Sequence, residues 1–439
     1  MASTSLTKTF SSAGNRKTWT WSGWVKKQIQ SSGNMNLFDA NDNSSDRAGI
    51  ILDNNQLRFF ATGCDVKLSP LLRDVSAWYH IVVAVDTTQA TDTNRIKFYI
   101  NGEQITSYTS ATWYSQNTDG LINNNVEHGI GVDSLYNNQY FDGSMAHIHF
   151  IDGTQYAASD FGETDATTGI WKPKTAPSVT YGTNGFFLKF ENSGSMGTDS
   201  SGNGNNFTVN GTMTQTIDTP SNVFATMNPL VPSTNITFSN GNNRLTGSQS
   251  DNYSQNTIST LGVSSGKWYC EAKYTTANVN TNANVGIATL ENFRYDVNNT
   301  AVSGFANVRF DGQLYVDGSA GTATYWGSNP VAGDIIMFAL DMDNGKFYLG
   351  KNGTWENSGD PTSGSTGTGS ITSSRSGTQA INVRYLASVF DFNFGNGYFG
   401  TTAVASAQNP DDGIGIFEYS VPTGYKALCT KSINAQEYS

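Results

Sequence analysis

Apolar residues recur at every second position in short runs along this chain, and the two clearest runs repeat one another in its two halves. Residues 80–86 (HIVVAVD) lead through a turn to residues 95–102 (RIKFYING). Residues 334–341 (DIIMFALD) lead in the same way to residues 345–353 (GKFYLGKNG). Alternating β-branched and aromatic residues suit a half-buried strand, and Asn-Gly supplies the positive φ of a tight turn. The pattern predicts a β-hairpin in each half and therefore two β-sandwiches in series.

Length and composition agree with this prediction. A chain of 439 residues exceeds what one hydrophobic core usually serves. No long window carries apolar residues at i, i+3, i+4 and i+7, as an amphipathic helix requires. The 45 glycines and the low charged fraction of 14% are typical of short strands joined by polar turns. We therefore expect an all-β protein made of two antiparallel β-sandwich (jelly-roll) domains in tandem.

Prolines between residues 217 and 232 mark the expected domain boundary. Proline cannot sit in a central strand, so this stretch should connect the two sandwiches as an extended segment. The predicted domains are residues 1–228 and 229–439. Residues 358–379 are rich in Gly, Ser and Thr, which predicts a long surface loop that a protease should cut first.

Charge and apolar content exclude several classes of partner. The net charge of −11, without a cluster of Lys or Arg, argues against binding to nucleic acid or to an anionic membrane surface. The sequence has no signal-peptide pattern and no run of about 18 apolar residues, so we expect a soluble product of the cytoplasm without membrane insertion. Cys64, Cys270 and Cys429 are odd in number and far apart, which indicates neither a disulfide framework nor a zinc site.

The order of several short motifs resembles two known domain families. The first half resembles the laminin-G-like, concanavalin-type jelly roll in residues 16–26, 77–86, 101–102, 141–143 and 199–204. The second half resembles a SPRY domain in residues 266–271, 285–287, 333–336, 392–395 and 421–429. With the joint at residues 218–229, the tandem is similar to virion-associated proteins of tailed phages, especially marine ones.

That resemblance implies a non-enzymatic structural protein of the virion, such as a tail fibre, an appendage or a capsid decoration. Its implied partners are other virion proteins, further copies of the same chain in a homo-oligomer, and a host-surface glycan or protein that the virion binds in adhesion. Its implied location is the virion, after synthesis in the host cytoplasm. Two alternatives remain open: a virion polysaccharide depolymerase (glycoside hydrolase or lyase), and a purely structural spacer.

Catalysis by paired carboxylates lacks a sequence signal. Concanavalin-type glycosidases present two acids on one strand face, and no Glu-x-Asp-x-Glu motif occurs here. The nearest pairs are Glu163 with Asp165 and Asp341 with Asp343, and both lie beside turn sequences, where hairpin formation explains them better. We therefore predict that the protein is not an enzyme.

Two further clusters offer chemistry in principle. His147 and His149 are two residues apart and share one strand face, where they could bind a metal or act in a lyase beside Tyr140. The favoured interpretation places both on the polar face of an ordinary strand, with Ile148 and Phe150 pointing inward.

Asp39, Asp42 and Asp46 are weak candidates for a calcium site, against a solvated turn as the default. No other cofactor is expected.

Aromatic residues outside alternating strands are the best indication of binding. Aromatic faces stack on sugar rings, and neighbouring Asn, Asp, Ser and Gln can bond to hydroxyl groups, so the mixture suits saccharide recognition. Such residues also fill a sandwich rim or a subunit interface. The candidate ligand-binding residues are Trp113, Tyr114, Tyr136, Tyr140, Tyr325 and Trp326.

The N-terminus suggests how copies could assemble. Laminin-G-like domains of the phage group commonly carry one more strand before the segment that matches residues 6–10, and only five residues precede Leu6. The first sandwich would then lack an edge partner, and proteins usually cover such an edge. We therefore expect residues 1–10 to pair across a subunit boundary or with another virion protein.

Overall fold

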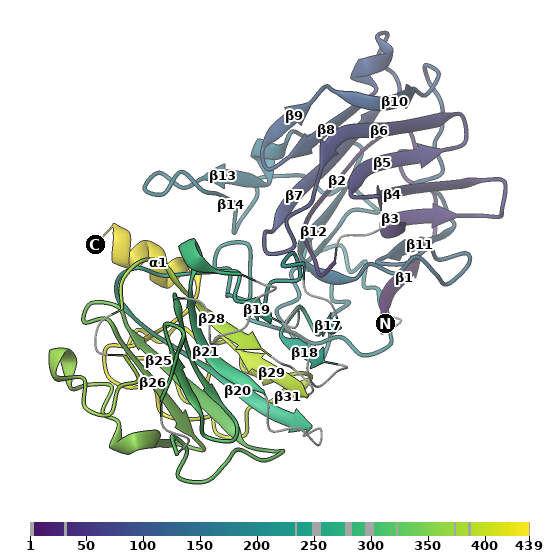
Figure 1. Ribbon diagram of the computed structural model, residues 1–439. Helices are drawn as coiled ribbons and strands as arrows, with labels where there is room; N and C mark the ends of the chain where they lie inside the picture. The colour runs from purple at the N-terminus through teal and green to yellow at the C-terminus, as the bar shows by residue number, and fades with distance from the viewer. Residues whose placement is uncertain are drawn as a thin grey trace. The chain divides into compact units, whose positions relative to one another are not determined.

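A computed structural model describes residues 4–29, 33–232, 235–247, 256–276, 283–294, 303–321, 324–372, 375–384 and 388–438 (Figure 1). The chain divides into two compact units. Unit 1 comprises residues 1–215 and 219–221, and unit 2 comprises residues 216–218 and 222–439. Both units are built from antiparallel sheets, which confirms the predicted all-β class of tandem sandwiches.

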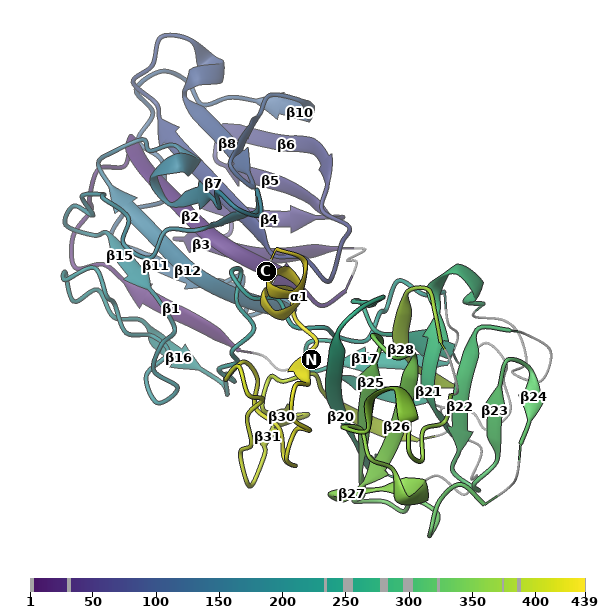
Figure 2. The ribbon, with the colours of Figure 1, turned by 90° about the vertical axis from the view of Figure 1, so that its left-hand side faces the viewer.

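Unit 1 contains two large sheets (Figure 2) and a small hairpin (Figure 1). The eight-stranded sheet has the order β10 (Tyr108–Thr112), β6 (Cys64–Leu71), β5 (Gln56–Ala61), β4 (Arg47–Asp53), β3 (Asn34–Asn41), β11 (Glu127–Ile130), β1 (Ser5–Thr9) and β16 (Thr208–Asn210). The six-stranded sheet has the order β15 (Phe186–Leu188), β12 (Gly143–Asp152), β2 (Thr18–Lys27), β7 (Tyr79–Asp86), β8 (Ile96–Ile100) and β9 (Glu103–Ile105). The small hairpin pairs β13 (Gly162–Thr164) with β14 (Trp171–Pro173).

The core of unit 1 lies between its two large sheets. Alternate residues of each strand point inward, so Ile50 and Phe59 of one sheet share a buried cluster with Trp21 and Val83 of the other. The outer face of the six-stranded sheet is also covered, because residues from the segment 156–181 pack onto it. On the eight-stranded sheet, by contrast, Arg47, Arg58 and Phe60 are only half-buried.

Unit 2 has the same type of construction. Its larger sheet has the order β17 (Ile236–Ser239), β18 (Arg244–Gly247), β29 (Val389–Asn393), β20 (Lys267–Thr276), β25 (Ile335–Asp341), β26 (Lys346–Lys351) and β27 (Thr354–Trp355), and β32 (Lys426–Ala427) pairs in parallel with β20. The six-stranded sheet has the order β19 (Asn256–Ile258), β28 (Gln379–Arg384), β21 (Asn284–Thr289), β22 (Phe305–Arg309), β23 (Leu314–Val316) and β24 (Ser319–Ala320). A small pair joins β30 (Tyr398–Phe399) to β31 (Thr402–Ala403).

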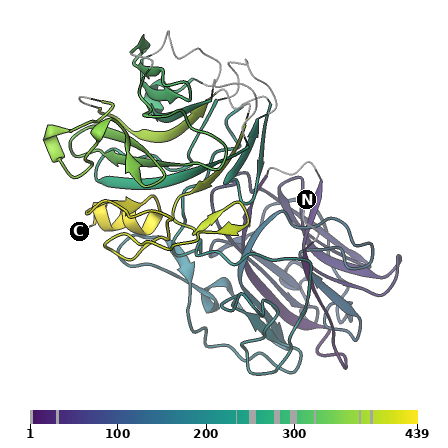
Figure 3. The same ribbon diagram turned by 90° about the horizontal axis from the view of Figure 1, so that it is seen from below.

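Helices are minor elements of the described chain. The α-helix α1 (Thr430–Glu437) lies just before the C-terminus (Figure 3). Single 3₁₀ turns occur at Asp92–Asn94, Ala158–Asp160, Leu290–Asn292, Glu356–Ser358 and Gly364–Thr366. Within the described residues, no helix is long and apolar enough to cross a membrane.

The predicted hairpins are confirmed, and the hairpin of unit 1 makes the same asparagine hydrogen bond as the hairpin of unit 2. Strand β7 pairs with β8 and β25 pairs with β26, each in antiparallel register. Asn101 and Asn352 both adopt a φ of 50°, and each is followed by a glycine with positive φ. The Asn101 side chain accepts a bond from the His80 amide at 2.8 Å, and the Asn352 side chain accepts one from the Ile335 amide at 2.8 Å.

The chain passes from unit 1 to unit 2 earlier than the sequence indicated. The predicted division falls after residue 228, but residues 222–228 already belong to unit 2. Phe224 is buried in an outer apolar layer of unit 2, and Ala225 and Met227 are buried in its main core. The apolar residues of the proline-rich joint therefore act as part of the second sandwich.

The polar tract at residues 358–379 is a surface loop, but it is bonded to the domain along the part that the structure describes. The Ile371 amide donates to the Phe347 carbonyl at 2.7 Å, and the Tyr425 hydroxyl donates to the Pro361 carbonyl at 2.9 Å. Residues 373 and 374 lie outside the described residues. These bonds remove the physical reason to expect the first proteolytic cut in residues 358–372.

The expectation of an unpaired edge at the N-terminus is wrong for the described residues. Strand β1 pairs with β11 on one side and with β16 on the other, all within unit 1. The added strand comes from Thr208–Asn210, near the end of the same unit, so sequence distance concealed it. Residues 1–3 lie outside the described residues.

Candidate functional site

Three of the six predicted aromatic residues are buried, and for them the predicted role is corrected. Tyr114 belongs to the core of unit 1, while Tyr325 and Trp326 belong to the core of unit 2. Trp326 is 5% exposed and donates its indole N–H to the Arg309 carbonyl at 2.8 Å. None of these three rings has a face open to a sugar, because all three are buried in a core.

The other three predicted residues differ in exposure. Trp113 is half-buried and packs edge-on against Tyr108, with ring centroids 5.2 Å apart. Tyr140 is also half-buried. Tyr136 is 50% exposed, and its ring faces the Arg47 guanidinium at 4.9 Å. Tyr136 is therefore the predicted residue best placed to meet a ligand.

Tyr136 stands at one end of a row of alternating rings and guanidinium groups. The Arg47 guanidinium lies 5.8 Å from the Phe60 ring centroid, and the Arg58 guanidinium lies 5.9 Å from the same centroid. Arg47, Phe60 and Arg58 alternate with the core residues of β4 and β5, so they point to the outer face of the eight-stranded sheet. We call this surface the Phe60 face, formed by Arg47, Gly49, Asp53, Arg58, Phe60, Asp65, Lys67 and Tyr136.

The Phe60 ring lies over the backbone of Gly49. The two residues are register partners on adjacent strands β4 and β5. A Cβ on residue 49 would lie 2.8 Å from Cε1 of Phe60, which is too close for a real contact. The absence of a side chain therefore allows the half-exposed ring to lie over the neighbouring strand.

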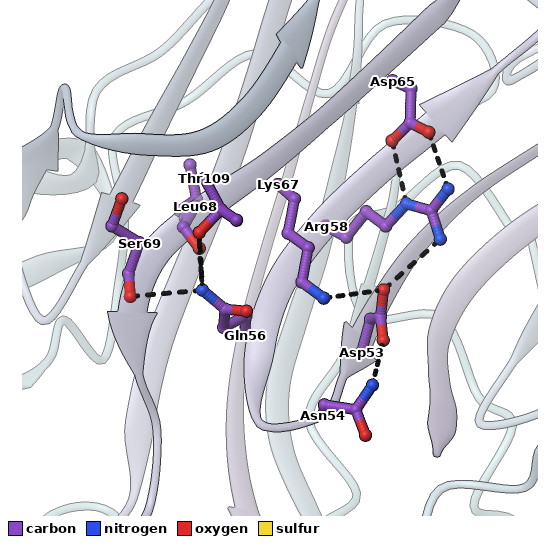
Figure 4. A network of polar contacts seen from close by, with 9 residues as sticks. All are labelled: Asp53, Asn54, Gln56, Arg58, Asp65, Lys67, Leu68, Ser69 and Thr109. Carbon is purple, nitrogen blue, oxygen red and sulfur yellow. Dashed lines mark hydrogen bonds and ion pairs between the residues drawn. The ribbon is translucent and has the colours of Figure 1, made fainter. Parts of the chain in front are cut away.

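An ion network occupies the other end of the row (Figure 4). Arg58 donates to Asp65 from Nε at 2.8 Å and from Nη2 at 2.6 Å, and its Nη1 lies 3.4 Å from Asp53. The bond to Asp65 raises the pKa of the Arg58 guanidinium. Lys67 lies 3.0 Å from the same Asp53 carboxylate. Cross-strand register places these charges together, since Arg58 pairs with Lys67 and Phe60 pairs with Asp65.

The turn that carries Tyr136 is held by two buried acids. Arg47 forms an ion pair with Asp133, whose side chain is fully buried. Asp39 accepts bonds from the Gly129 and Ser134 amides, both at 2.9 Å, and from the Asn41 side chain at 2.7 Å. Burial raises the pKa of Asp39 to about 7, although these donated bonds act in the opposite direction. The acids thus anchor the start of the loop to the sheet.

The predicted calcium ligands do not form a common set. Asp39 is buried in β3, whereas Asp42 is exposed in the turn that follows. The Asn43 side chain accepts bonds from the Ser45 and Asp46 amides, which makes the segment an ordinary polar turn. Across the described ranges, no group of three His, Cys, Asp or Glu side chains is arranged to hold a metal ion. Residues 42–46 therefore form the solvated turn that the sequence made the default interpretation.

A serine–histidine pair lies on the opposite sheet of unit 1, and its protonation is unsuited to nucleophilic catalysis. His80 Nε2 lies 2.9 Å from Ser22 Oγ, and the Trp171 indole N–H donates to His80 Nδ1 at 3.0 Å. An indole can only donate, so the neutral ring carries its proton on Nε2 and donates it to Ser22. A catalytic histidine must instead accept the serine proton. Burial lowers the pKa of His80 to about 3, which keeps the ring neutral.

His147 and His149 are not on an open polar face, which corrects the favoured interpretation. Ile148 and Phe150 point into the core as predicted. His149 is 1% exposed, stacks on Phe187 at 3.9 Å and bonds to the Tyr181 hydroxyl at 2.9 Å. His147 has a φ of 48° in a β-bulge, where two residues of β12 oppose one residue of β2.

One acid of each carboxylate pair bonds within a turn, as the sequence indicated. Asp165 accepts bonds from the Thr167 and Thr168 amides and from Lys172. Asp341 accepts two bonds from Asn344, which closes the β25–β26 turn. These acids serve hairpins at positions where the chain reverses direction.

Sequence reasoning missed most of the Phe60 face. Arg47, Gly49, Phe60 and Arg58 lie in strands β4 and β5, which carry no functional motif in the sequence. The alternation in QLRFFA at residues 56–61 could have placed Arg58 and Phe60 on one face. Their meeting with Tyr136 could not be found in this way, because Tyr136 comes from a loop much later in the chain.

Comparison with known proteins shows a similarity in unit 1. Residues 3–159 match the family Laminin_G_3, described as the concanavalin A-like lectin/glucanases superfamily. Most of unit 1 is therefore similar to a concanavalin A-like domain. The matched segment includes all the residues of the Phe60 face. That description names both sugar-binding proteins and glycan hydrolases, so the chemistry of the site has to separate the two.

Solved SPRY domains are also similar to this chain. The SPRY domain of human HERC1 is 21% identical, with a TM-score of 0.29, and covers 38% of this chain and 96% of its own. The PSpry domain of TRIM65 is 11% identical, with a TM-score of 0.29, and covers 38% and 90%. A human SPRY domain is 16% identical, with a TM-score of 0.26, and covers 36% and 94%. No curated protein matches the chain.

Proposed function

We propose that the concanavalin A-like domain is a non-enzymatic glycan-binding module that binds its ligand on the Phe60 face. The observation that carries the proposal is the stacked row of Tyr136, Arg47, Phe60 and Arg58 on an outer sheet face. Aromatic rings that are partly exposed and held in place can stack on sugar rings at little entropic cost. The carboxylates and amides around them can bond to hydroxyl groups.

Binding without hydrolysis fits the state of the acids on this face. Asp65 holds a two-pronged bond from Arg58, and Asp53 is bonded to Arg58 and Lys67. A glycosidase needs one protonated acid and one free carboxylate beside the scissile bond. Both carboxylates on this face are already bonded to cationic partners, so they do not form such a pair.

Glycan-array binding by the intact chain tests the proposal. We expect Phe60→Ala and Tyr136→Ala each to weaken binding about tenfold, because each removes a stacking surface worth about 1–2 kcal/mol. Tyr438→Ala is the matched control, since Tyr438 is 59% exposed and lies in unit 2. Release of new sugar ends from a bound glycan, abolished by Asp65→Asn, would instead establish the depolymerase alternative.

We also propose that this module serves adhesion of a tailed-phage virion to the host surface, as a fibre, appendage or decoration that contains several copies of the chain. The support is the resemblance of the two domain types and their joint at residues 218–229 to virion proteins. Antibody labelling of purified particles tests this role. The proposal fails if the chain is present in infected cells but absent from intact particles.

A further inference from the structure

The Phe60 face contains cations, but each of them is matched by a carboxylate. Arg47 pairs with Asp133, Arg58 pairs with Asp65, and Lys67 pairs with Asp53. The Arg58 guanidinium donates from all three of its nitrogens to carboxylates of the same face. An anionic ligand would therefore compete with Asp65 and Asp53 at every nitrogen of Arg58, and it would meet Arg47 and Lys67 already paired with Asp133 and Asp53.

The exposed polar atoms of the face favour a hydroxyl group over a carboxylate. The Asp65 side chain is 45% exposed, whereas those of Arg58 and Lys67 are 29% and 18% exposed. A sugar hydroxyl can donate to the open side of Asp65, while a uronate or sulfate would be repelled by it. The whole chain adds to this effect, since its net charge of −11 repels polyanions at long range.

We infer that the ligand of the Phe60 face is a neutral saccharide chain, which stacks on Phe60 and Tyr136 and bonds through its hydroxyl groups. This inference rests on the proposed function and narrows its ligand class. It also assigns a role to Asp65. That carboxylate neutralises Arg58, holds the guanidinium beside the Phe60 ring, and excludes acidic sugars from the row.

Titration calorimetry of the intact chain tests the ligand class. The probes are linear hexamers of glucose, galactose and mannose, and equally long hexamers of galacturonate and mannuronate. We expect a neutral hexamer to bind at least tenfold more tightly than either uronate hexamer. We also expect its Kd to change less than twofold between 50 and 500 mM NaCl, because stacking and neutral hydrogen bonds are little screened by salt.

Asp65→Asn tests the role of the carboxylate. Loss of its charge leaves Arg58 only partly neutralised, so affinity for a uronate hexamer should rise at least threefold, while affinity for the neutral hexamer should not rise. Asp119→Asn is the matched control, because it makes the same change of net charge at a side chain that is 58% exposed and pairs with Lys17, which is not part of the face.

The outcomes separate this inference from the proposed function. Tighter binding of a uronate hexamer, weakened at least tenfold by salt and lost in Arg58→Gln, would overturn the neutral-ligand inference and leave glycan binding intact. Binding of neutral hexamers that Phe60→Ala does not change would overturn the assignment to this face. Absence of binding to both classes would overturn the inference together with the proposed function.

Discussion

At the scale of single residues, Gly49 shows how a missing side chain shapes the binding surface. Phe60 lies on an outer sheet face, where a large ring needs a flat support to stay beside the two arginines. The support is the bare backbone of Gly49 on the adjacent strand, and Asp39 lies on its other side in register. The position requires glycine for space, since Gly49 is not among the residues with positive φ.

Gly49→Ala should displace the Phe60 ring. The new Cβ would lie 2.8 Å from one ring atom and 3.0 Å from the next, so the ring has to tilt away from its place between Arg47 and Arg58. We expect a loss of about 1–2 kcal/mol in the free energy of unfolding of unit 1, as for other overpacked sites, and weaker glycan binding. Urea unfolding and calorimetry measure the two effects. Gly33→Ala is the control, because a Cβ there meets nothing within 4 Å, and equal effects of both variants would contradict the account.

At the scale of elements, the same hairpin device appears once in each unit. An apolar strand is followed by a turn, a Lys-Phe-Tyr strand and an Asn-Gly pair in the left-handed region. In both units the asparagine side chain also accepts the backbone amide at the start of the first strand. One residue thus satisfies the turn geometry and closes the end of the hairpin.

Asn101→Ala and Asn352→Ala should each destabilise only the unit that contains the residue. Alanine is strained at a positive φ and cannot make the side-chain bond. Together these losses should lower the free energy of unfolding of the unit by about 1–2 kcal/mol. Asn101→Gly separates the two terms, because glycine restores the backbone conformation but not the bond. Differential scanning calorimetry should show one of two transitions shifted in each variant. A shift of both transitions by a single substitution would show that the units do not unfold separately.

At the scale of the whole molecule, the histidines are unequally divided between the two units. All four histidines lie in unit 1, at residues 80, 128, 147 and 149. Burial lowers the pKa of His80 to about 3 and that of His128 to about 4, and it lowers the pKa of His149 well below its usual value. In unit 2, burial raises the pKa of Glu271 to about 7.

These shifts predict opposite responses to acid. A histidine whose pKa is depressed in the folded state favours unfolding once the unfolded chain takes up protons, so stability is lost as pH falls below about 6.5. At pH 5 the cost is about 2 kcal/mol for each fully buried ring. A carboxyl group with a raised folded pKa has the reverse effect, because the unfolded chain releases its proton first as pH rises from about 4 to 7.

Between pH 7 and pH 5, the transition of unit 1 should therefore move to lower temperature and that of unit 2 should not. Asp39 offsets part of the loss in unit 1, since its pKa is also raised to about 7, but several histidines act against it. Calorimetry at the two pH values gives the shifts, and Asn101→Ala and Asn352→Ala assign each transition to its unit. A larger acid-induced shift in unit 2 would contradict the prediction.

The sequence by itself determined the fold class, because its signals are local. Alternation with a period of two selects the paired strands at residues 80–102 and 334–353, and Asn-Gly selects the tight turn that follows each pair and leads into β9 or β27, so these elements could be placed without any distant contact. The sequence did not determine which strand pairs with the outer side of β1 or where unit 2 begins. The partner of β1 comes from Thr208–Asn210, and the exact start of unit 2 depends on where Phe224 and Met227 are buried.

The binding surface was decided by the tertiary structure. Alternation shows which residues share a face of a strand, but not whether another segment covers that face. The outer side of one sheet is buried under residues 156–181, which encloses His149, while the outer side of the other leaves Phe60 partly exposed. Burial likewise removed Tyr114, Tyr325 and Trp326 from the candidates and retained Tyr136. Strand register and one anchored loop bring Tyr136, Arg47, Phe60 and Arg58 together, and these are long-range contacts that no local pattern encodes.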